Sequence, residues 1–244
     1  MQRRDLTGTV IAVTGAGSGI GRASAEELID ARARLALGDL RAESLTALAE
    51  EHPGADLAQV AMDAGTADGA NRLVAAAVAE FGHLDSIVIN AGVGYFGGIT
   101  DWDDEQIEAM VATNVAGTMW ATRAAVRQFD AQGRGGDIVL IASVAGLAAA
   151  NSWEAVYAAT KHAQVGFAAT LAREVTPRGV RVSVIAPAAV HTRFAFGTGR
   201  TEDDPELDAY MRPSDIAFAV RTVLEQPRRL RTALWSMWSM AEQP

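Results

Sequence analysis

The sequence predicts an α/β fold, a single domain in which a doubly wound parallel sheet carries helices on both faces. Short β-branched runs alternate along the chain with alanine-rich stretches of helical periodicity. A glycine-rich turn joins the first of these runs to the first helix. The chain has 244 residues, of which 49% are hydrophobic, and this suits one sizeable core spanning residues 1–244.

Composition excludes several classes of function. The chain has no cysteine, which rules out disulfides, thiolate zinc sites and a cysteine nucleophile, and we expect no metal site. A net charge of -9 argues against a nucleic-acid partner, which would require a basic face. No apolar run reaches the roughly 18 residues of a membrane span, and the run after Asp5 is too short for a signal peptide. We therefore expect a cytoplasmic protein with no membrane partner.

The first strand and helix enclose a glycine-rich turn. Val10–Thr14 reads as a strand and Ile20–Ala31 as an amphipathic helix, with Thr14-Gly-Ala-Gly-Ser-Gly-Ile-Gly21 between them. Such an opening turns backbone N–H groups and a helix N-terminus toward a pyrophosphate. The spacing is TGxxxGxG rather than GxGxxG, because Ile20 stands at the third glycine position. The alternative is a surface turn that merely contains three glycines, namely Gly15, Gly19 and Gly21.

An acidic residue follows the second strand. Leu35–Gly38 ends in Asp39, which lies 18 residues after Gly21. A carboxylate there accepts hydrogen bonds from the adenosine ribose and repels a 2′-phosphate, which favours NAD over NADP. Arg41 counts against this preference, since it can pair with a phosphate or with Asp39. Alternatively, Asp39 caps the helix that begins near Ala42.

Two further strands end in residues suited to a cofactor. Leu57–Met62 is followed by Asp63, placed to meet an adenine edge, and then by a helix over Thr66–Phe81. Ser86–Ile89 is followed by Asn90-Ala91-Gly92, whose small side chains allow the backbone to approach a ligand closely. Alternating strands and helices predict right-handed crossovers, with ligands at the strand carboxyl ends.

The next helix and strand carry two polar candidates. A helix over about Asp104–Gln132 contains Asn114 close to a glycine, and both residue types are poor in a helix interior. They indicate a local distortion with a purpose, although a merely tolerated weak turn is the alternative. Asp137–Ala142 is the fifth strand, and Ser143 lies at its carboxyl end, where catalytic side chains gather in such sheets.

Lys161 is the only lysine in the chain, and the other 20 of the 21 basic residues are arginine. It follows Tyr157 by four residues, so the two side chains share a helix face. An ammonium beside a phenol stabilises the phenolate and lowers the phenol's pKa, which makes Tyr157 a candidate general acid/base. The alternative is an exposed helical tyrosine with a solvated lysine.

Taken together, these residues resemble the short-chain dehydrogenase/reductase family over about residues 7 to 226. The matching pieces are Thr14 to Gly21, Asp63, Asn90 to Gly92, Asn114, Ser143, Tyr157 with Lys161, and Pro187 followed by Thr192. The resemblance implies a Rossmann-like seven-stranded sheet and hydride transfer at the nicotinamide C4. It also implies that Tyr157 gives or takes the proton, that Ser143 donates to the carbonyl, that Lys161 holds the nicotinamide ribose and that Asn114 anchors a water in the proton relay.

The resemblance also assigns residues to the cofactor. They are Gly15, Ser18, Gly19, Ile20, Gly21, Asp39, Asp63, Asn90, Ala91, Gly92, Tyr157, Lys161, Pro187, Val190 and Thr192. Two departures from the family pattern stand out. Pro187-Ala188 follows the sixth strand, Arg181–Ile185, where the family usually has Pro-Gly, and the extra Cβ narrows the nicotinamide site or tilts the next loop. The C-terminal run of residues 229–238 replaces a glycine-rich ending and predicts a last strand that leads into a subunit contact.

The substrate loop is expected at about residues 188–213. Residues 193–212 are irregular, which is typical of a lid, and Ser214 is the expected N-cap of a helix reaching Gln226. His191 is a weaker candidate for substrate contact, and His162 points away from the Tyr157 face. The predicted pocket wall comprises Val93 to Phe96, Val144, Leu147, Trp153, Ala188, Phe194 and Phe196.

An apolar wall with Arg193 as its main charge favours an apolar alcohol or ketone over an acid or a sugar phosphate. We therefore expect an NAD-dependent oxidoreductase, NADP being less favoured, that interconverts a secondary alcohol and its ketone. An NADP-dependent ketoreductase and a catalytically idle dinucleotide-sensing protein are the alternatives, and the complete Asn-Ser-Tyr-Lys set argues against the second.

Assembly is expected through the helices at about residues 104–132 and 154–176. Small side chains there permit close packing between subunits, which predicts a homotetramer with a dimer as the fallback. The alternative is that these alanines pack only within the subunit. They are Ala121, Ala124, Ala125, Ala168 and Ala169.

Overall fold

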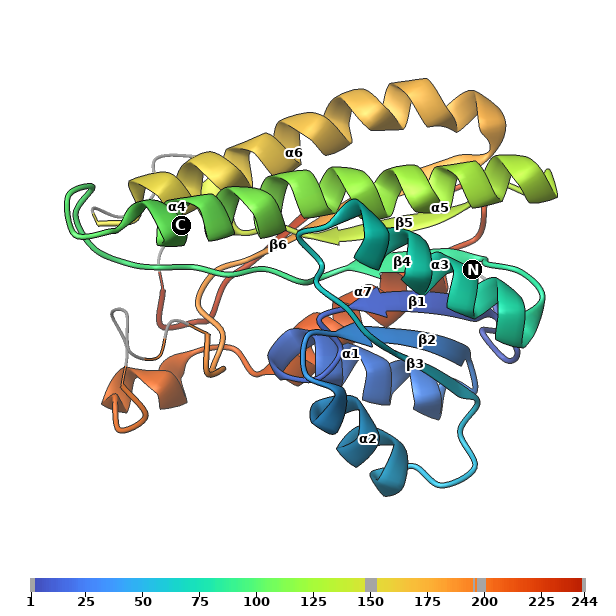
Figure 1. The fold of residues 1–244 in the computed structure, drawn as a ribbon, viewed down its shortest axis with the longest axis horizontal. Coiled ribbons are helices and arrows are strands. Elements are labelled where there is room, and N and C mark those ends of the chain that lie inside the picture. Colours follow the sequence, from blue (N-terminus) through green and yellow to red (C-terminus); the bar gives the residue numbers. More distant parts are fainter. Residues whose placement is uncertain (1–2, 148–152, 195, 197–200, 243–244) are drawn as a thin grey trace.

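The computed structural model describes residues 3–147, 153–194, 196 and 201–242. Its centre is a parallel sheet of seven strands in the order β3-β2-β1-β4-β5-β6-β7 (Figure 1). The predicted α/β fold with a doubly wound parallel sheet is confirmed. The strands are β1 (Val10–Thr14), β2 (Arg34–Asp39), β3 (Leu57–Ala61), β4 (Ser86–Ile89), β5 (Gly136–Ile141), β6 (Val180–Pro187) and β7 (Leu234–Met237).

Helices cover both faces of this sheet (Figure 1). One face packs against α1 (Gly19–Asp30), α2 (Ala42–Glu51) and α7 (Pro213–Leu224). The other packs against α3 (Ala67–Phe81), α5 (Thr118–Gln132) and α6 (Ala155–Val175), and the short α4 (Asp104–Met110) precedes α5. Within the described part of the chain, no helix combines the length and the apolar character that a membrane crossing requires.

The order of the strands determines at which edge of the sheet a ligand is expected to bind. The chain runs outward from β1 to β3 and then returns to pair β4 with β1 on its other side. This reversal opens a crevice at the carboxyl ends of β1 and β4, which is where ligands bind in open α/β sheets. The C-terminal run ends as predicted in a strand, because Leu234–Met237 pairs with the end of β6.

The helix predicted over Asp104–Gln132 is interrupted by a π-helical segment, Val111–Gly117. Asn114 lies at its centre and is 0% exposed. A Cβ at Gly117 would clash with the Ala64 carbonyl oxygen, so glycine is required where this wide turn meets the chain after β3. The predicted distortion is confirmed, and π turns of this kind frequently occur at functional sites.

Two expectations about helices are wrong. Helix α7 begins at Pro213 rather than after Ser214, because proline is suited to the first helical position and the Asp215 carboxylate accepts from Arg212 N at 2.7 Å. Four of the five alanines assigned to subunit packing are buried within this chain's own core instead, and they are Ala121, Ala124, Ala125 and Ala168.

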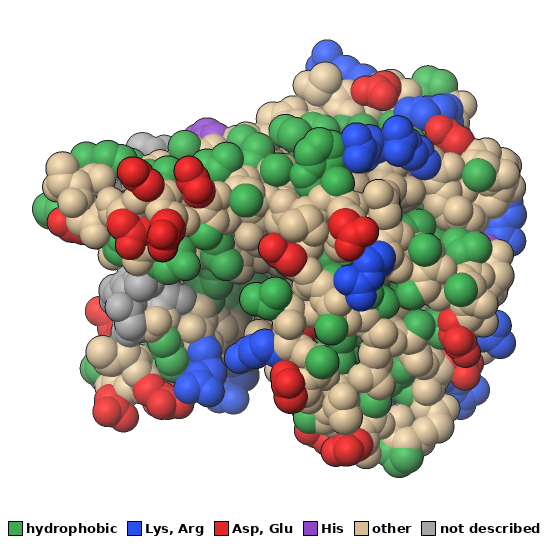
Figure 2. Space-filling view, in the orientation of Figure 1, with side chains coloured by type: hydrophobic (Ala, Val, Ile, Leu, Met, Phe, Trp, Pro, Cys, Tyr) green, Lys and Arg blue, Asp and Glu red, His purple; other side chains and the backbone are tan. Residues whose placement is uncertain are grey.

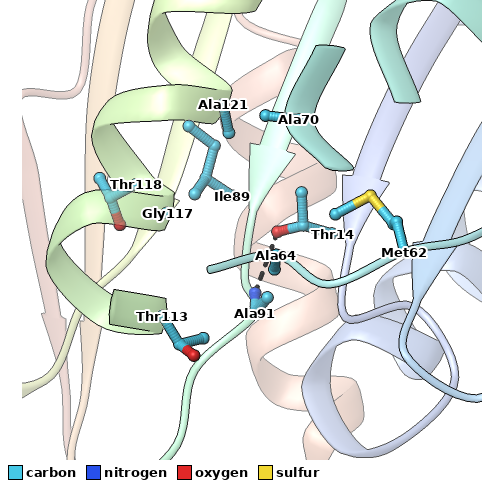
Figure 3. A pocket seen from close by; sticks show the side chains of 10 residues that line it. All are labelled: Thr14, Met62, Ala64, Ala70, Ile89, Ala91, Thr113, Gly117, Thr118 and Ala121. Carbon is cyan, nitrogen blue, oxygen red and sulfur yellow. Dashed lines mark hydrogen bonds between the residues drawn. The ribbon is translucent and has the colours of Figure 1, made fainter. Parts of the chain in front are cut away.

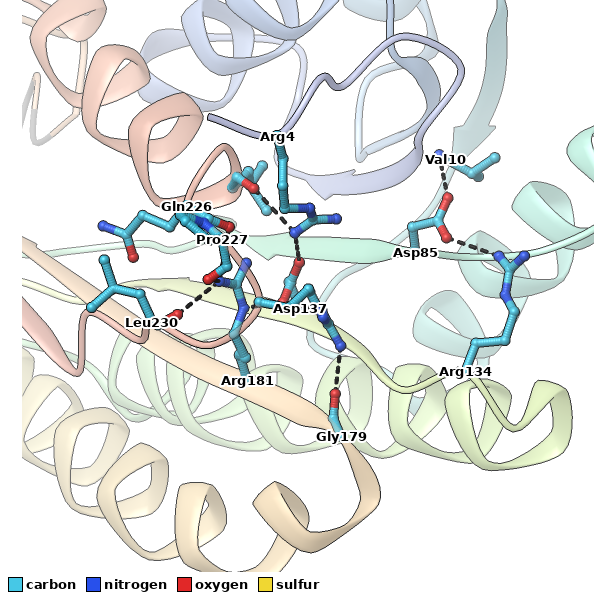
Figure 4. Close-up of polar contacts among 12 residues, drawn as sticks. Arg4, Val10, Asp85, Arg134, Asp137, Gly179, Arg181, Gln226, Pro227 and Leu230 are labelled. Carbon is cyan, nitrogen blue, oxygen red and sulfur yellow. Dashed lines mark hydrogen bonds and ion pairs between the residues drawn. The ribbon is translucent and has the colours of Figure 1, made fainter. Parts of the chain in front are cut away.

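The buried carboxylate of Asp137, at the amino end of β5, binds arginines from the N-terminal arm and from the segment after α7 (Figure 4). Asp137 Oδ2 accepts from Arg4 Nη1 at 2.7 Å, and Oδ1 accepts from Arg181 Nε and Arg228 Nη1, both at 2.6 Å. The Asp137 side chain is only 3% exposed. Arg181 Nη1 also donates to the backbone carbonyls of Gln226, Pro227 and Leu230. The N-terminal arm, β5, β6 and the segment after α7 therefore share one ion cluster.

We expect Asp137→Asn to lower the free energy of unfolding by about 3–5 kcal/mol, because it leaves the buried Arg181 guanidinium without its counter-charge. Urea denaturation measures the loss. Asp130→Asn is the control, since Asp130 pairs with Arg178 on the surface and should cost no more than about 1 kcal/mol. Equal losses of unfolding free energy in the two variants would contradict the larger contribution that we assign to buried Asp137.

Candidate active site

The glycine-rich turn after β1 has a backbone that only glycine fits. Gly15 and Gly19 have φ values of +66° and +52°, in the left-handed region. A Cβ at Gly21 would clash with the Gly15 carbonyl oxygen. Gly17, which sequence reasoning passed over, would place a Cβ 2.6 Å from Ser44 Cβ and 2.8 Å from Asp39 Cγ. The glycines therefore allow the turn to pack closely on the residues that follow β2 and β4, at the N-terminus of α1.

Asp39 faces this turn from the end of β2. Its Oδ2 accepts from Gly17 N at 2.8 Å and its Oδ1 from Arg41 N at 3.0 Å. Arg41 is the N-cap residue of α2, and no side chain caps that helix, so the alternative reading of Asp39 as the cap is wrong. The carboxylate is instead fixed against the glycine-rich turn.

Asn90 and Thr14 lock β4 to β1. Thr14 Oγ1 accepts from the backbone N–H groups of Asn90 and Ala91, both at 3.0 Å. Asn90 Nδ2 donates to the carbonyls of Thr14 at 3.1 Å and Gly15 at 3.2 Å. Asp63, which follows β3, is exposed and accepts from Gly65 N.

A narrow crevice lies beside this edge, between the end of β4 and helices α3 and α5 (Figure 3). None of its lining residues belongs to the hydrophobic cluster around Tyr157. Its lining residues are Thr14, Met62, Ala64, Ala70, Ile89, Ala91, Thr113, Gly117, Thr118 and Ala121.

Asn114 ties the loop after β4 to α6. Its Oδ1 accepts from Val93 N at 2.9 Å, and its Nδ2 donates to Val93 O at 2.8 Å and to Thr160 Oγ1 at 3.0 Å. Its backbone carbonyl accepts from Gln164 Nε2 at 2.9 Å and from Thr118 Oγ1 at 2.7 Å. A carbonyl oxygen has two lone pairs, and two side chains occupy them. The role of Asn114 as the anchor of a water stays a prediction.

Tyr157 and Lys161 lie on the first two turns of α6, and both are buried, at 8% and 4% exposure. Lys161 Nζ is 5.5 Å from the centroid of the Tyr157 ring. The alternative of an exposed tyrosine with a solvated lysine is therefore wrong. Burial lowers the pKa of Lys161 to about 7, because removal from water disfavours the charged amine.

Ser143 is held at the end of β5. Its Oγ accepts from Ala145 N at 3.2 Å and donates to the Pro187 carbonyl at 3.3 Å. The short turn that it begins, Val144–Gly146, packs closely on α6, since a Cβ at Gly146 would lie 2.5 Å from the Lys161 carbonyl oxygen. Strand β5 and helix α6 thus bring Ser143 to the same end of the molecule as Lys161.

Aromatic rings surround Tyr157. Its ring centroid is 5.2 Å from that of Phe96 and 5.8 Å from that of Phe194. Phe194 also packs on Gly94, where a Cβ would lie 2.6 Å from the ring. Of the predicted pocket wall, Trp153 is 69% exposed, and Ala188 packs against the core on the α1 and α7 side. Residues 148–152 and 197–200 of the lid and its surroundings lie outside the described part.

The start of the substrate loop lies against the glycine-rich turn. A Cβ at Gly19 would be 3.3 Å from the Thr192 methyl carbon. Val190 is buried and forms a parallel bridge with Met211. His191 and Arg193 are exposed. His162 is exposed too, as expected for a residue that points away from Tyr157, and its Nδ1 lies 3.0 Å from the Ala158 carbonyl.

Residues 9–203 match the family model described as short chain dehydrogenase. The chain belongs to the short-chain dehydrogenase family. It is accordingly an oxidoreductase that acts on CH–OH or C=O groups.

Relatives and solved structures of this family cover most of the chain. The 3beta-hydroxysteroid dehydrogenase 2 of Eggerthella lenta is 35% identical over 195 residues, which is 79% of this chain and 75% of the relative. An alcohol dehydrogenase from the archaeon Thermococcus sibiricus, complexed with 5-hydroxy-NADP, has a TM-score of 0.87 and 28% identity, covering 97% of this chain and 98% of its own. A 3-ketoacyl-(acyl-carrier-protein) reductase from Brucella melitensis, complexed with NADH, has a TM-score of 0.83 and 27% identity, covering 95% and 97%.

In this short-chain dehydrogenase, sequence reasoning missed four polar or small residues at the site. Gly17 could have been found from the alternation of glycines in residues 15–21. Thr160 and Gln164 each lie three residues after Tyr157 or Lys161, a spacing that places them on the same helix face. Thr118 carried no signal, because its bond to the Asn114 carbonyl depends on the π-helical segment.

Proposed function

We propose that this short-chain dehydrogenase uses NAD(H) to interconvert a largely apolar secondary alcohol and its ketone, with Tyr157 as the general acid/base. The buried Tyr157–Lys161 pair carries the proposal. Burial of an amine costs free energy, and a pair that stays on the solvated surface avoids this cost.

The glycine-rich turn fits a dinucleotide, because a turn of this kind at a helix N-terminus directs backbone N–H groups toward a pyrophosphate. Gly15, Gly17 and Gly21 allow the close packing on neighbouring residues that holds the turn there. The Ser18 side chain makes no cap bond at the start of α1, which leaves its hydroxyl for a phosphate. Further contacts would come from Ile20, Asp63, Asn90, Ala91, Gly92, Pro187, Val190 and Thr192. When bound, the nicotinamide ring accepts or donates the hydride.

The protein's own residues handle the proton. As the alcohol is oxidised, its hydroxyl proton would pass to the Tyr157 phenolate and the carbon that bears the hydroxyl would lose a hydride to the cofactor, so that a ketone forms. Ser143 turns its hydroxyl from the Pro187 carbonyl to the substrate oxygen. A charged Lys161 lowers the pKa of the phenol and favours the phenolate near neutral pH.

Tyr157→Phe should keep cofactor binding and lower kcat roughly 100-fold or more, because the proton has no acceptor. Lys161→Arg should damage both binding and kcat, since a planar guanidinium does not fit a buried ammonium site. Fluorescence titration with NADH and steady-state kinetics measure the two effects. An unchanged rate in Tyr157→Phe would sink the mechanism, and a wild-type protein that binds NADH without turning over any alcohol would favour the sensing alternative.

NAD preference rests on Asp39. The carboxylate is buried and held by Gly17 N at the end of β2, where a 2′-phosphate would meet an uncompensated like charge. Arg41 lies two residues on and is the group that would offset this repulsion. The solved relatives include one complex with an NADP derivative and one with NADH. The experiment below therefore compares the two cofactors.

Wild-type kcat/KM should be higher with NAD than with NADP, and Asp39→Ala should raise the use of NADP. Asp39→Asn keeps an oxygen for Gly17 N–H while it removes the charge, so it separates repulsion from the loss of a hydrogen bond. Glu43→Ala is the control, since it removes a carboxylate from the first turn of α2 and should leave the ratio unchanged. A higher wild-type kcat/KM with NADP would overturn the preference and point to Arg41.

The aromatic rings around Tyr157 support an apolar substrate. Phe96 and Phe194 lie against the reacting phenol, whereas Arg193 is exposed. A charged substrate among these rings would lose hydration without a paired charge. The relative named as a steroid dehydrogenase fits the same class of apolar secondary alcohol.

In a panel of apolar, acidic and sugar alcohols with NAD, we expect the apolar secondary alcohols to have the highest kcat/KM. Phe194→Ala should lower that value about tenfold, because it removes a large apolar contact. Arg193→Ala, the neighbouring control, should change it less than about twofold, as expected for an exposed charge. A clear preference for acids that disappears in Arg193→Ala would show the pocket assignment to be wrong.

A homotetramer in the cytoplasm is the expected state, with a dimer as the alternative. The outer side of the α5 and α6 layer carries apolar side chains (Figure 2), and Val111 and Met119 are 45% and 39% exposed. Such residues are candidates for burial between subunits. A monomeric mass in light scattering at micromolar concentration would refute the assembly.

A further inference from the structure

On the side away from Tyr157, Lys161 Nζ donates hydrogen bonds to two neutral oxygen atoms. It donates to Gln164 Oε1 at 3.0 Å and, more weakly, to the Ile141 carbonyl at 3.4 Å. Its other side faces the Tyr157 ring, whose centroid is 5.5 Å away, and Gly92, where a Cβ would lie 3.8 Å from Nζ. Within the described ranges, no carboxylate forms an ion pair with this amine, and Tyr157 is the titratable group that faces it.

Gln164 is 1% exposed and lies one turn after Lys161 on α6. Its Nε2 donates to the Asn114 carbonyl at 2.9 Å and to Thr118 Oγ1 at 2.8 Å. The Thr118 hydroxyl in turn donates to the Asn114 carbonyl at 2.7 Å. Every polar hydrogen and the oxygen of the Gln164 amide therefore have partners.

The orientation of this amide is fixed by chemistry. An ammonium only donates hydrogen bonds, and a backbone carbonyl only accepts them. The Gln164 oxygen must therefore face Lys161 and its nitrogen must face Asn114. A flipped amide would set donor against donor at Lys161 and acceptor against acceptor at Asn114.

We propose that Gln164 is a positioning residue that holds the Lys161 ammonium in place, sets its ionisation and links it to the π-helical segment Val111–Gly117. This inference rests on the proposed function, in which Lys161 serves Tyr157. Gln164 acts through Lys161 and touches neither substrate nor cofactor.

Two consequences follow from an amide at this place. Its oxygen stabilises the charged amine and so offsets part of the cost of burial. An amide neither gains nor loses a proton near neutral pH, so the path from Lys161 through Gln164 to Asn114 carries no proton. Protons must then reach Lys161 and Tyr157 from the side of the amine that faces Gly92.

The single lysine makes the test direct. Labelling with lysine enriched in ¹³C at Cε gives one side-chain NMR signal, whose titration reports Lys161 alone, without substrate or cofactor. In Gln164→Met, which has a similar volume and no acceptor, the acid dissociation constant of Lys161 should rise about tenfold, so that its pKa falls. In Gln164→Glu the new carboxylate should raise the pKa of Lys161 above that of the wild type.

Gln132→Met is the matched control. Gln132 bonds to the backbone N and O of Leu84 from the far end of α5, so its loss removes similar bonds away from Lys161. The Lys161 titration should be unchanged in it. A wild-type titration in folded Gln164→Met would overturn the proposal. If that variant fails to fold, an unchanged titration in Gln164→Glu, whose shape is closest to glutamine, would overturn it equally.

Turnover supplies the second readout. If Lys161 serves Tyr157, Gln164→Met should lower kcat about tenfold and move the acid limb of its pH profile to higher pH, because a less charged lysine raises the pKa of the phenol. A shifted titration with an unshifted profile would overturn the link to Tyr157. Absence of turnover in the wild type would refute the proposed function, whereas the NMR titration would still decide the role of Gln164 toward Lys161.

Discussion

Burial of one amine is the constraint on which the site depends. Lys161 is removed from water at the start of α6, and the cost is offset by the Gln164 amide and the Ile141 carbonyl rather than by a carboxylate. Burial lowers the pKa of Lys161 to about 7, and neutral acceptors offset this lowering less than an ion pair would. The charge of this amine can therefore respond to a group bound beside Tyr157, whereas a salt bridge would have fixed it.

The π-helical segment Val111–Gly117 supplies the other half of this arrangement. Its wide turn presents the Asn114 carbonyl to side chains from α5 and α6, and the Asn114 side chain holds the loop after β4 at Val93. One residue thus joins the loop after β4 to α6. Satisfied buried networks of this kind favour a single arrangement, because each broken bond leaves a polar group without water.

The sheet and the glycine-rich turn were predictable because their signals are local. β-branched runs, glycine positions and the Tyr157–Lys161 spacing can all be read along the chain. Contacts between residues that are far apart in the sequence could not be predicted in this way. Gln164 is an ordinary helix residue until the π turn brings the Asn114 carbonyl to it. The alanines of α5 and α6 suit close packing, but spacing does not say whether the neighbour is this chain's own sheet or another subunit. Pro213 outweighed Ser214 as the helix start, because its φ is already helical.

The proposed acid/base chemistry and the apolar surroundings of Tyr157 depend on the same packing. Phe96 and Phe194 exclude water from one side of Tyr157, while core residues cover the other. With water excluded, the effective dielectric constant falls and the charge on Lys161 acts more strongly on the phenol. A polar substrate would bring water with it and weaken this coupling. Under the proposed function, selection of an apolar substrate and activation of Tyr157 would therefore be consequences of the same packing, and a change in one of these rings would alter both.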